Sequence, residues 1–265
     1  MNITQKYMTK NRCYTSPVPI TVSKLVLHSL GVAQPCSDGI FNSMNSPSAS
    51  VSVHGFIETD RVIQTLPWNY RAWHVGSGDK GSYNSKAIGV EICEPKGHGY
   101  NGGTMVNYDA KSNEEYFKKV YNNAVQLFAY LCNKYSLNPL NDIVCHCEAH
   151  SLGYGSNHSD VMQWFPKHGK SMDIFRKDVQ IAMNYTPATP ITRNSDSEAV
   201  KWLQHKLNTC LTGTKGFIPL VVDGDYGAKT RAAVLLYWKL LGWKPSTGWS
   251  AGVNPKKALT AGRKA

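Results

Sequence analysis

The chain has 265 residues, which is long enough to bury one good core and to form a second, smaller domain. Its net charge of +11 favours an anionic polymer as partner, such as nucleic acid, an anionic membrane surface or an anionic cell wall. It contains no apolar run long enough for a transmembrane helix, and its first residues lack the apolar segment of a signal peptide. We therefore expect a soluble protein, made in the cytoplasm without a signal peptide.

Short strands with alternating faces are predicted in the first hundred residues. The first, Val22 to His28, ends on a histidine, and the second spans Val51 to Ile57. In the third, Ala87 to Cys93, Glu91 is a carboxylate on an otherwise apolar strand. Charged groups are rarely buried unless they are paired or used, so Glu91 is a candidate functional residue. The alternative is a solvent-facing glutamate on an edge strand.

A helix follows the Gly- and Asn-rich loop of residues 95–112. Ser112 with Glu115 three residues later is typical of a capping box. The next apolar positions have the spacing of a helix packed against a core: Phe117, Val120, Ala124, Leu127, Phe128 and Leu131. Ile143 to His146 is predicted to be a strand and Met172 to Met183 a closing helix. The first domain, residues 1–183, is thus predicted to be α/β, with a central mixed β-sheet flanked by helices.

Residues 184–196 contain two prolines and several Ser and Thr without an apolar period, which predicts a linker. Residues 197–265 contain two amphipathic stretches separated by a DG turn, which predict a second, small, mainly helical domain. This segment carries eleven Lys and Arg against three acidic residues, a net charge of +8. Most of the attraction to a polyanion is therefore expected from the C-terminal segment.

Residues 142–165 concentrate side chains that can bind a metal or carry a proton. His28 and His146 both stand at predicted strand ends and on one face, and neutral imidazoles are common zinc ligands. Cys145 and Cys147 would point to the opposite face if the strand continued through them. The pair His146 and His150 lacks the glutamate that directly follows the first histidine of a metalloprotease helix. The spacing leaves the third ligand open among His150, His158 and Asp160.

Several ordered motifs together resemble one known family. LVLHS, SVHGFI, RAWHVG, AIGVEICE and CHCEAHSLGYGSNHSDVMQWF, across roughly residues 20–170, are similar to zinc-dependent N-acetylmuramoyl-L-alanine amidases, which are related to peptidoglycan recognition proteins. The likeness is greatest to the cell-wall lysins of phages. It implies that His28, His146 and Asp160 bind Zn²⁺, with Asp160 where many members have Cys. It also implies that Glu91 and His158 are catalytic.

The implied reaction is hydrolysis, by zinc-activated water, of the amide bond between the lactyl group of N-acetylmuramic acid and L-alanine. Glu91 would be the general acid and base, and His158 would stabilise the oxyanion. His54, Trp73 and His74 lie in matching motifs and are candidate substrate-binding residues. Core aromatics and hydrogen-bonded structural histidines are the alternative for these three.

The C-terminal motifs VKWLQHKLN and VDGDYGAKTRAAVLLYW are similar to the helical peptidoglycan-binding domain of wall hydrolases. The second element expected of that domain is degenerate here, at STGWSAGVNPKKAL. The partner implied is bacterial peptidoglycan, with neither nucleic acid nor membrane, and the protein would act at the cell wall after phage-style release. The alternatives are a non-catalytic peptidoglycan recognition protein and a zinc peptidase that cuts within the stem peptide.

Overall fold

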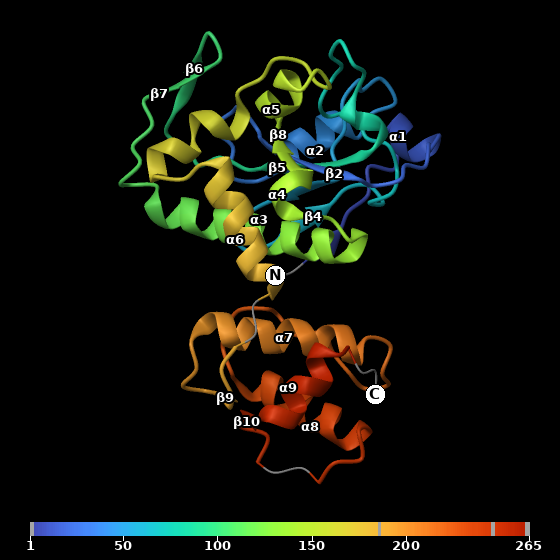
Figure 1. Ribbon diagram of the computed structural model, residues 1–265, viewed down its shortest axis with the longest axis vertical. Coiled ribbons are helices and arrows are strands. Elements are labelled where there is room, and N and C mark those ends of the chain that lie inside the picture. Colours follow the sequence, from blue (N-terminus) through green and yellow to red (C-terminus); the bar gives the residue numbers. More distant parts are fainter. Residues whose placement is uncertain (1–2, 185–186, 245–246, 263–265) are drawn as a thin grey trace. The chain divides into compact units, whose positions relative to one another are not determined.

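A computed structural model describes residues 3–184, 187–244 and 247–262 of the chain. The chain divides into two compact units, one of residues 3–184 and one that begins at residue 185, and each is described by itself (Figure 1). In the first unit the helices and strands are β1 (Ile3–Gln5), α1 (Arg12–Thr15), β2 (Lys24–Ser29), α2 (Asp38–Met44), β3 (Gly55–Ile57), β4 (Val62–Gln64), η1 (Tyr83–Ser85), β5 (Ala87–Ile92), β6 (Gly99–Asn101), β7 (Thr104–Val106), α3 (Glu114–Tyr135), α4 (Pro139–Asp142), β8 (Ile143–Cys145), α5 (His146–Ser151), η2 (Asp160–Gln163), η3 (Phe165–His168) and α6 (Met172–Asn184).

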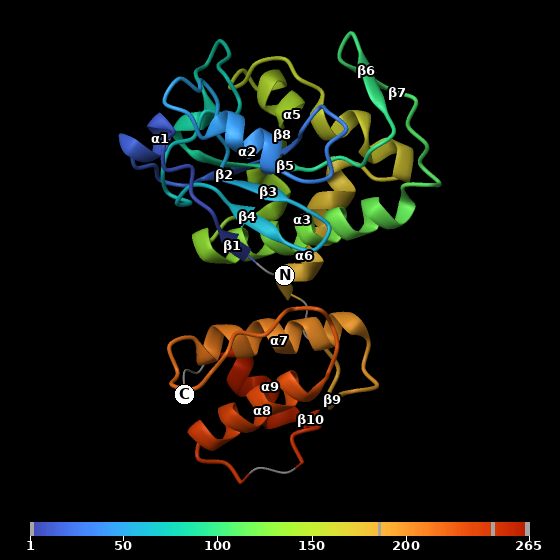
Figure 2. The ribbon, with the colours of Figure 1, turned by 180° about the vertical axis from the view of Figure 1, so that it is seen from behind.

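A six-stranded sheet in the order β1-β4-β3-β5-β2-β8 organises the first unit. β3 and β4 run antiparallel, whereas every other neighbouring pair runs parallel. Helices cover both faces: α3, α4 and α6 lie on one side, and α1 and α2 lie on the other (Figures 1 and 2). The predicted α/β class with a central mixed sheet and flanking helices is confirmed.

The neighbouring interior strands β2 and β5 are largely apolar because both of their faces are covered. Their register places His28 directly beside Glu91, and Val26 beside Gly89. Side chains at paired positions of adjacent strands project from the same face of a sheet. His28 and Glu91 therefore stand side by side at the carboxyl ends of two parallel strands.

Helix α3 buries the predicted apolar face, including Phe117, Val120 and Phe128. It packs against α6, where the ring centroids of Phe128 and Phe175 are 5.3 Å apart. This pair of helices packs on the sheet, with α3 against β3 and α6 against β8.

The capping box predicted at Ser112 is wrong. The hydroxyl of Ser112 donates to the carboxylate of Asp109, and the same carboxylate accepts the backbone N–H groups of Lys111 and Ser112. The helix begins two residues later, at Glu114, without a side-chain cap from Asn113. The aspartate competes successfully for the serine because a charged acceptor makes the stronger hydrogen bond.

The second unit contains three helices and a two-stranded antiparallel sheet among its described residues: β9 (Ile191–Thr192), α7 (Ser197–Leu211), α8 (Ala228–Leu240), β10 (Ser250–Ala251) and α9 (Val253–Thr260). Its core includes Leu203, Leu207, Val234 and Tyr237. Ile191 is fully buried in that core, although the sequence predicts a linker over residues 184–196. Strand β9 forms because it pairs with β10, which lies almost sixty residues further along the chain. The residues around Ile191 therefore do not predict this strand by themselves.

Within the described residues, no helix combines the length and the apolar character needed to cross a bilayer.

Candidate active site

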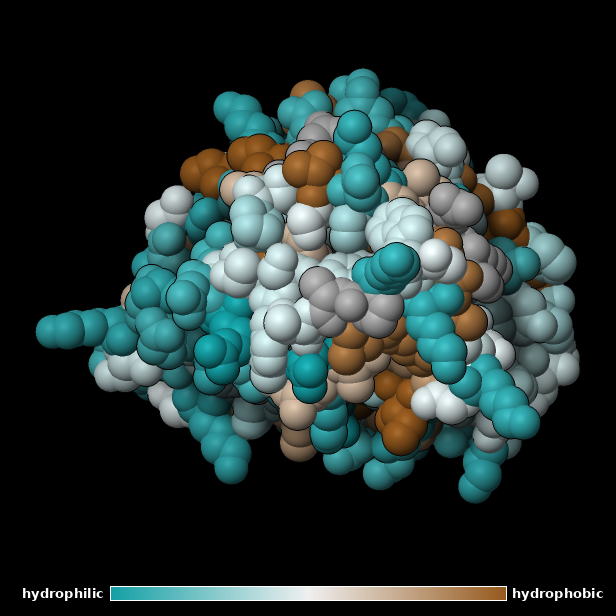
Figure 3. Space-filling view, turned by 90° about the horizontal axis from the view of Figure 1, so that it is seen from below, coloured by the Kyte–Doolittle hydropathy of each residue, from teal (hydrophilic) through white to brown (hydrophobic). Residues whose placement is uncertain are grey.

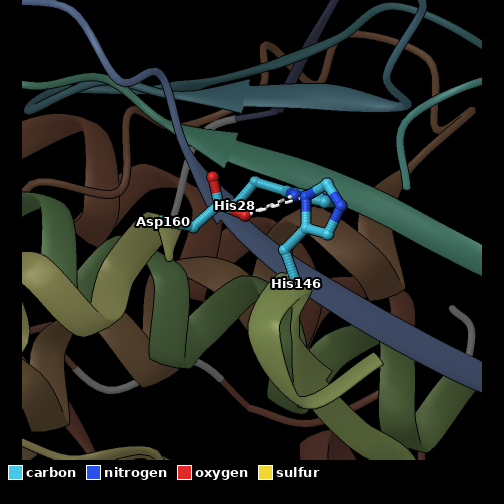
Figure 4. A group of neighbouring side chains, drawn as sticks. All are labelled: His28, His146 and Asp160. Carbon is cyan, nitrogen blue, oxygen red and sulfur yellow. Dashed lines mark hydrogen bonds and ion pairs between the residues drawn. The ribbon is translucent and has the colours of Figure 1, made fainter. Parts of the chain in front are cut away.

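The three side chains predicted to bind zinc converge at the carboxyl-terminal edge of the sheet (Figure 4). His28 comes from β2, His146 is the first residue of α5 after β8, and Asp160 is the first residue of η2. The ligand atoms of the three residues all lie within 4.8 Å of one another. Two imidazoles and a carboxylate from three separate elements thus face one point, as in three-ligand catalytic zinc sites.

One carboxylate oxygen contacts both imidazoles. Oδ2 of Asp160 lies 3.2 Å from Nδ1 of His28 and 3.0 Å from Nδ1 of His146. Nε2 of His146 lies 3.2 Å from the carbonyl oxygen of Val75, which can only accept a hydrogen bond. We therefore assign the proton of neutral His146 to Nε2. Its Nδ1 lone pair then faces a carboxylate oxygen, an arrangement that suits a cation bound between the two atoms.

Burial acts to raise the pKa of Asp160. Without a metal ion, the opposite effect of His146 and His28, which donate hydrogen bonds to Asp160 when their Nδ1 atoms are protonated, is larger and lowers that pKa below its ordinary value. His28 is 1% exposed, and its burial lowers the pKa of the imidazole. An ionised carboxylate beside a neutral imidazole is the protonation state that metal ligands require. The donor set therefore fits a divalent metal ion.

The backbone of Asp160 has a φ of 44°, in the left-handed region that L-residues other than Gly, Asn and Asp rarely adopt. Such conformations persist where the surrounding structure enforces them, and they cluster at functional sites. Here η2 is tied to the β6–β7 hairpin by Gln163, whose Oε1 accepts the N–H of Met105 at 2.6 Å. The hairpin thus helps to hold the turn that carries the carboxylate.

Glu91 projects from β5 beside His28. Among the described residues, its buried Oε2 has no hydrogen-bond partner. Burial, together with the negative charges of Asp160 and Glu94, raises the pKa of Glu91 well above its ordinary value. An unpartnered carboxyl group that binds its proton tightly, beside a candidate metal site, is suited to moving protons.

His158 lies at the same site on an exposed loop. Its ring centroid is 4.5 Å from that of His146, and its Nδ1 lies 3.1 Å from Oγ of Ser156. The same Ser156 hydroxyl lies 3.1 Å from Nε2 of His146. The loop therefore holds an accessible imidazole next to the candidate metal ligands.

The three predicted substrate-binding residues differ in position. His74 lies against the site, with Nδ1 at 3.0 Å from Nε2 of His28. Trp73 is half-buried and packs against a core cluster that includes Phe41 and Phe56. His54 is fully buried, accepts the N–H of Gly89 on Nδ1 and donates from Nε2 to the carbonyl of Tyr70. The position of His54 therefore favours the alternative role, that of a hydrogen-bonded structural histidine.

The arrangement of His54 predicts an acid-labile contribution to stability. Burial lowers its pKa from 6.5 to about 4, so the stabilisation is fully present above pH 6.5 and is lost as the pH falls toward 4. The full shift corresponds to about 3 kcal/mol of unfolding free energy. Urea unfolding across this pH range should show that His54→Gln, which does not titrate, loses less stability than the wild type. Parallel pH profiles for the two proteins would contradict this assignment.

The other metal-ligand candidates of residues 142–165 lie outside the cluster. Strand β8 ends at Cys145, whose sulfur is 3.2 Å from that of Cys147, and α5 begins at His146. His150 is exposed and bonds the carbonyl of Gly155 at 3.1 Å. The helix containing His146 and His150 does form, yet only His146 faces the candidate metal site.

Three residues at the site, Val75, Asn84 and Ser156, have no role predicted from the sequence, although Val75 and Ser156 lie within the quoted motifs. The carbonyl of Val75 and the hydroxyl of Ser156 both contact Nε2 of His146. The side-chain amide of Asn84 contacts the backbone of residues 74 and 75. Such contacts join residues far apart in the chain, and no spacing rule identifies them.

Comparison with known families gives a match over residues 18–163 to the model described as N-acetylmuramoyl-L-alanine amidase. This range covers more than half of the chain and contains all three candidate ligands and Glu91. The chain belongs to the N-acetylmuramoyl-L-alanine amidase family. The family resemblance expected from the motifs is thereby confirmed.

Among curated proteins, this amidase-family chain is similar to N-acetylmuramoyl-L-alanine amidase CwlA of Bacillus subtilis, with 36% identity over 83 residues. That match covers 31% of this chain and only 30% of the relative. Among solved structures, hydrolase AmiA of Staphylococcus aureus is similar with 22% identity and a TM-score of 0.53, over 69% of this chain and 83% of that one. The PlyG catalytic domain gives 20% identity and a TM-score of 0.51, over 71% and 99% respectively. At these identities the two structures support the fold alone.

Proposed function

We propose that this protein hydrolyses the amide bond between the lactyl group of N-acetylmuramic acid and the L-alanine of the stem peptide in bacterial peptidoglycan. The observation that carries the proposal is the Asp160 carboxylate oxygen that faces Nδ1 of both His28 and His146, inside the range that matches the amidase family. This set of side chains suits a cation, and amide hydrolysis would use an electrophilic one.

His28, His146 and Asp160 would hold Zn²⁺, since three N and O ligands with an open fourth position suit a catalytic zinc. When bound there, zinc supplies a water of lowered pKa and polarises the scissile carbonyl. The immobilised ligands fix the place of the reaction at the ends of β2 and β8.

Glu91 would accept the proton of the attacking water and return it to the nitrogen of the departing L-alanine. The new C–O bond would form first and place negative charge on the former carbonyl oxygen, and the C–N bond would then break as the carbonyl re-forms and the amine leaves with the proton. The raised pKa of Glu91 makes its carboxylate a stronger base toward the water than an ordinary carboxylate, and it keeps the acid form available for the departing nitrogen. His158, accessible beside His146, would donate a hydrogen bond to the developing oxyanion.

We further propose that the second unit binds the cell wall and raises the local concentration of the catalytic unit there. Residues 197–265 carry a net charge of +8 and would be attracted to an anionic wall. Figure 3 shows apolar residues among hydrophilic ones on a face of this unit, and the exposed apolar side chains of the unit include Ile218, Val221 and Val253.

The charge of the second unit predicts salt-sensitive wall binding. Raising the salt concentration from about 0.1 to 1 M shortens the Debye length from about 10 to 3 Å, so co-sedimentation with purified walls should fall. Binding that is unchanged by salt would mean that the cationic surface does not carry the attraction.

The proposed reaction is tested by digestion of purified peptidoglycan. New amino-terminal L-alanine should form without new reducing sugar, and the reaction should stop when a chelator removes the metal and resume when Zn²⁺ is restored. New reducing ends would indicate cleavage of the glycan instead. A protein that binds walls without releasing any new end would be the non-catalytic alternative.

A further inference from the structure

The segment of residues 74–75 contacts the ring nitrogen of each candidate histidine ligand that points away from Asp160. Nε2 of His28 lies 3.0 Å from Nδ1 of His74, and Nε2 of His146 lies 3.2 Å from the carbonyl oxygen of Val75. Each imidazole thus turns Nδ1 toward Asp160 and Nε2 toward residues 74–75. One short segment fixes the orientation of two ligands that are 118 positions apart in the sequence.

The hydrogen bonds also fix which nitrogen of each ligand is free. The Val75 carbonyl can only accept, so His146 donates from Nε2 and keeps the lone pair on Nδ1. For His28 to offer Nδ1 to the same ion, its proton must sit on Nε2 and be donated to Nδ1 of His74. His74 is the acceptor that selects this tautomer.

Asn84 in η1 immobilises the segment. Its side-chain oxygen accepts the backbone N–H of His74 at 2.9 Å and that of Val75 at 3.1 Å. One amide oxygen thereby sets the position of both groups that contact the ligands.

The ring of His74 lies directly over β5 at Gly89. A Cβ atom at Gly89 would come within 2.3 Å of Cγ and Nδ1 of that ring. The glycine is therefore required for His74 to reach His28, since any larger residue would displace the ring from the sheet. Because the His74 ring packs directly against the backbone of Gly89, its position is well defined.

We propose that His74 and Asn84 are positioning residues of the metal site, which together with the Val75 carbonyl present Nδ1 of His28 and His146 to the ion. The inference rests on the proposed zinc site and assigns His74 a role other than substrate binding. Neither residue touches the metal, and both act by fixing the tautomer and direction of the ligands.

The test is the Zn²⁺ affinity of the full chain, measured by competition with a chromophoric chelator. His74→Ala and Asn84→Ala should each weaken Zn²⁺ binding by about 10- to 100-fold. This is the usual effect of removing a residue that hydrogen-bonds a metal ligand without touching the metal. His74→Asn, whose side-chain oxygen can replace Nδ1 as acceptor, should recover part of the loss. His150→Ala and Asn69→Ala, at exposed positions outside this network, serve as matched controls.

Two further measurements separate positioning from loss of fold. Circular dichroism should show that the metal-free variants remain folded at the temperature of the binding assay, and the visible spectrum of bound Co²⁺ should change in His74→Ala. Weaker zinc binding by the folded variants supports the inference even where the wild type shows no amide hydrolysis. Zinc affinities and Co²⁺ spectra equal to those of the wild type in both folded variants would overturn it, whatever the activity.

Discussion

Glu91→Gln is expected to bind Zn²⁺ with the affinity of the wild type and to lose about 10²- to 10⁴-fold in turnover, the usual contribution of a general acid–base group. Glutamine keeps the size of the side chain but can neither accept nor return the proton. Glu91 is not among the three residues that converge on the candidate metal position, so metal binding should survive. The measurement is the initial rate of L-alanine end formation, with bound zinc determined on the same sample.

The matched control for this variant is Glu115→Gln, which makes the same change at an exposed position on α3. It should retain full activity and full zinc content. If Glu91→Gln also remained fully active, Glu91 would not be the proton carrier, and the proposed mechanism would have to be abandoned.

His28→Ala is expected to lose both zinc and activity. The remaining histidine and aspartate would supply two ligands, too few for a stable catalytic zinc site. The loss of Zn²⁺ affinity should exceed about 100-fold, which is roughly the largest loss usual for a residue that only hydrogen-bonds a metal ligand. Metal content after dialysis, measured beside the rate of hydrolysis, checks this result.

Because His28 is buried, removing it also leaves Asp160 without one of its two imidazole partners, which costs roughly 1–3 kcal/mol of stability. Circular dichroism must therefore show that the variant is folded. His150→Ala, in the same helix as His146 but outside the cluster, should keep its zinc. A folded His28→Ala protein with normal zinc content would refute the assignment of this ligand.

Strand periodicity is the strongest guide in the sequence. The strand patterns single out His28 at the end of one apolar strand and Glu91 within another, and the register of β2 and β5 places the two side by side. The apolar stripe of α3 is equally informative, since both patterns follow directly from burial on one side. These features depend on neighbours only a few residues away.

Other features depend on contacts between distant residues. The left-handed backbone of Asp160 and the link from His74 to His28 come from packing across the sheet, and pairing with β10 turns part of the expected linker into a strand. Spacing alone leaves the third ligand open, and only the family resemblance assigns it. His54 lies in a motif that matches the family, yet its buried hydrogen bonds favour a structural role.

The most direct test of the proposed function is mass spectrometry of the products from a defined N-acetylmuramoyl peptide incubated with the zinc-loaded protein. We predict two products, free N-acetylmuramic acid and an intact peptide that begins with L-alanine, and neither should form after chelation. Release of N-acetylmuramoyl-L-alanine with a shortened peptide would contradict the proposal, because it would place the cut within the stem peptide.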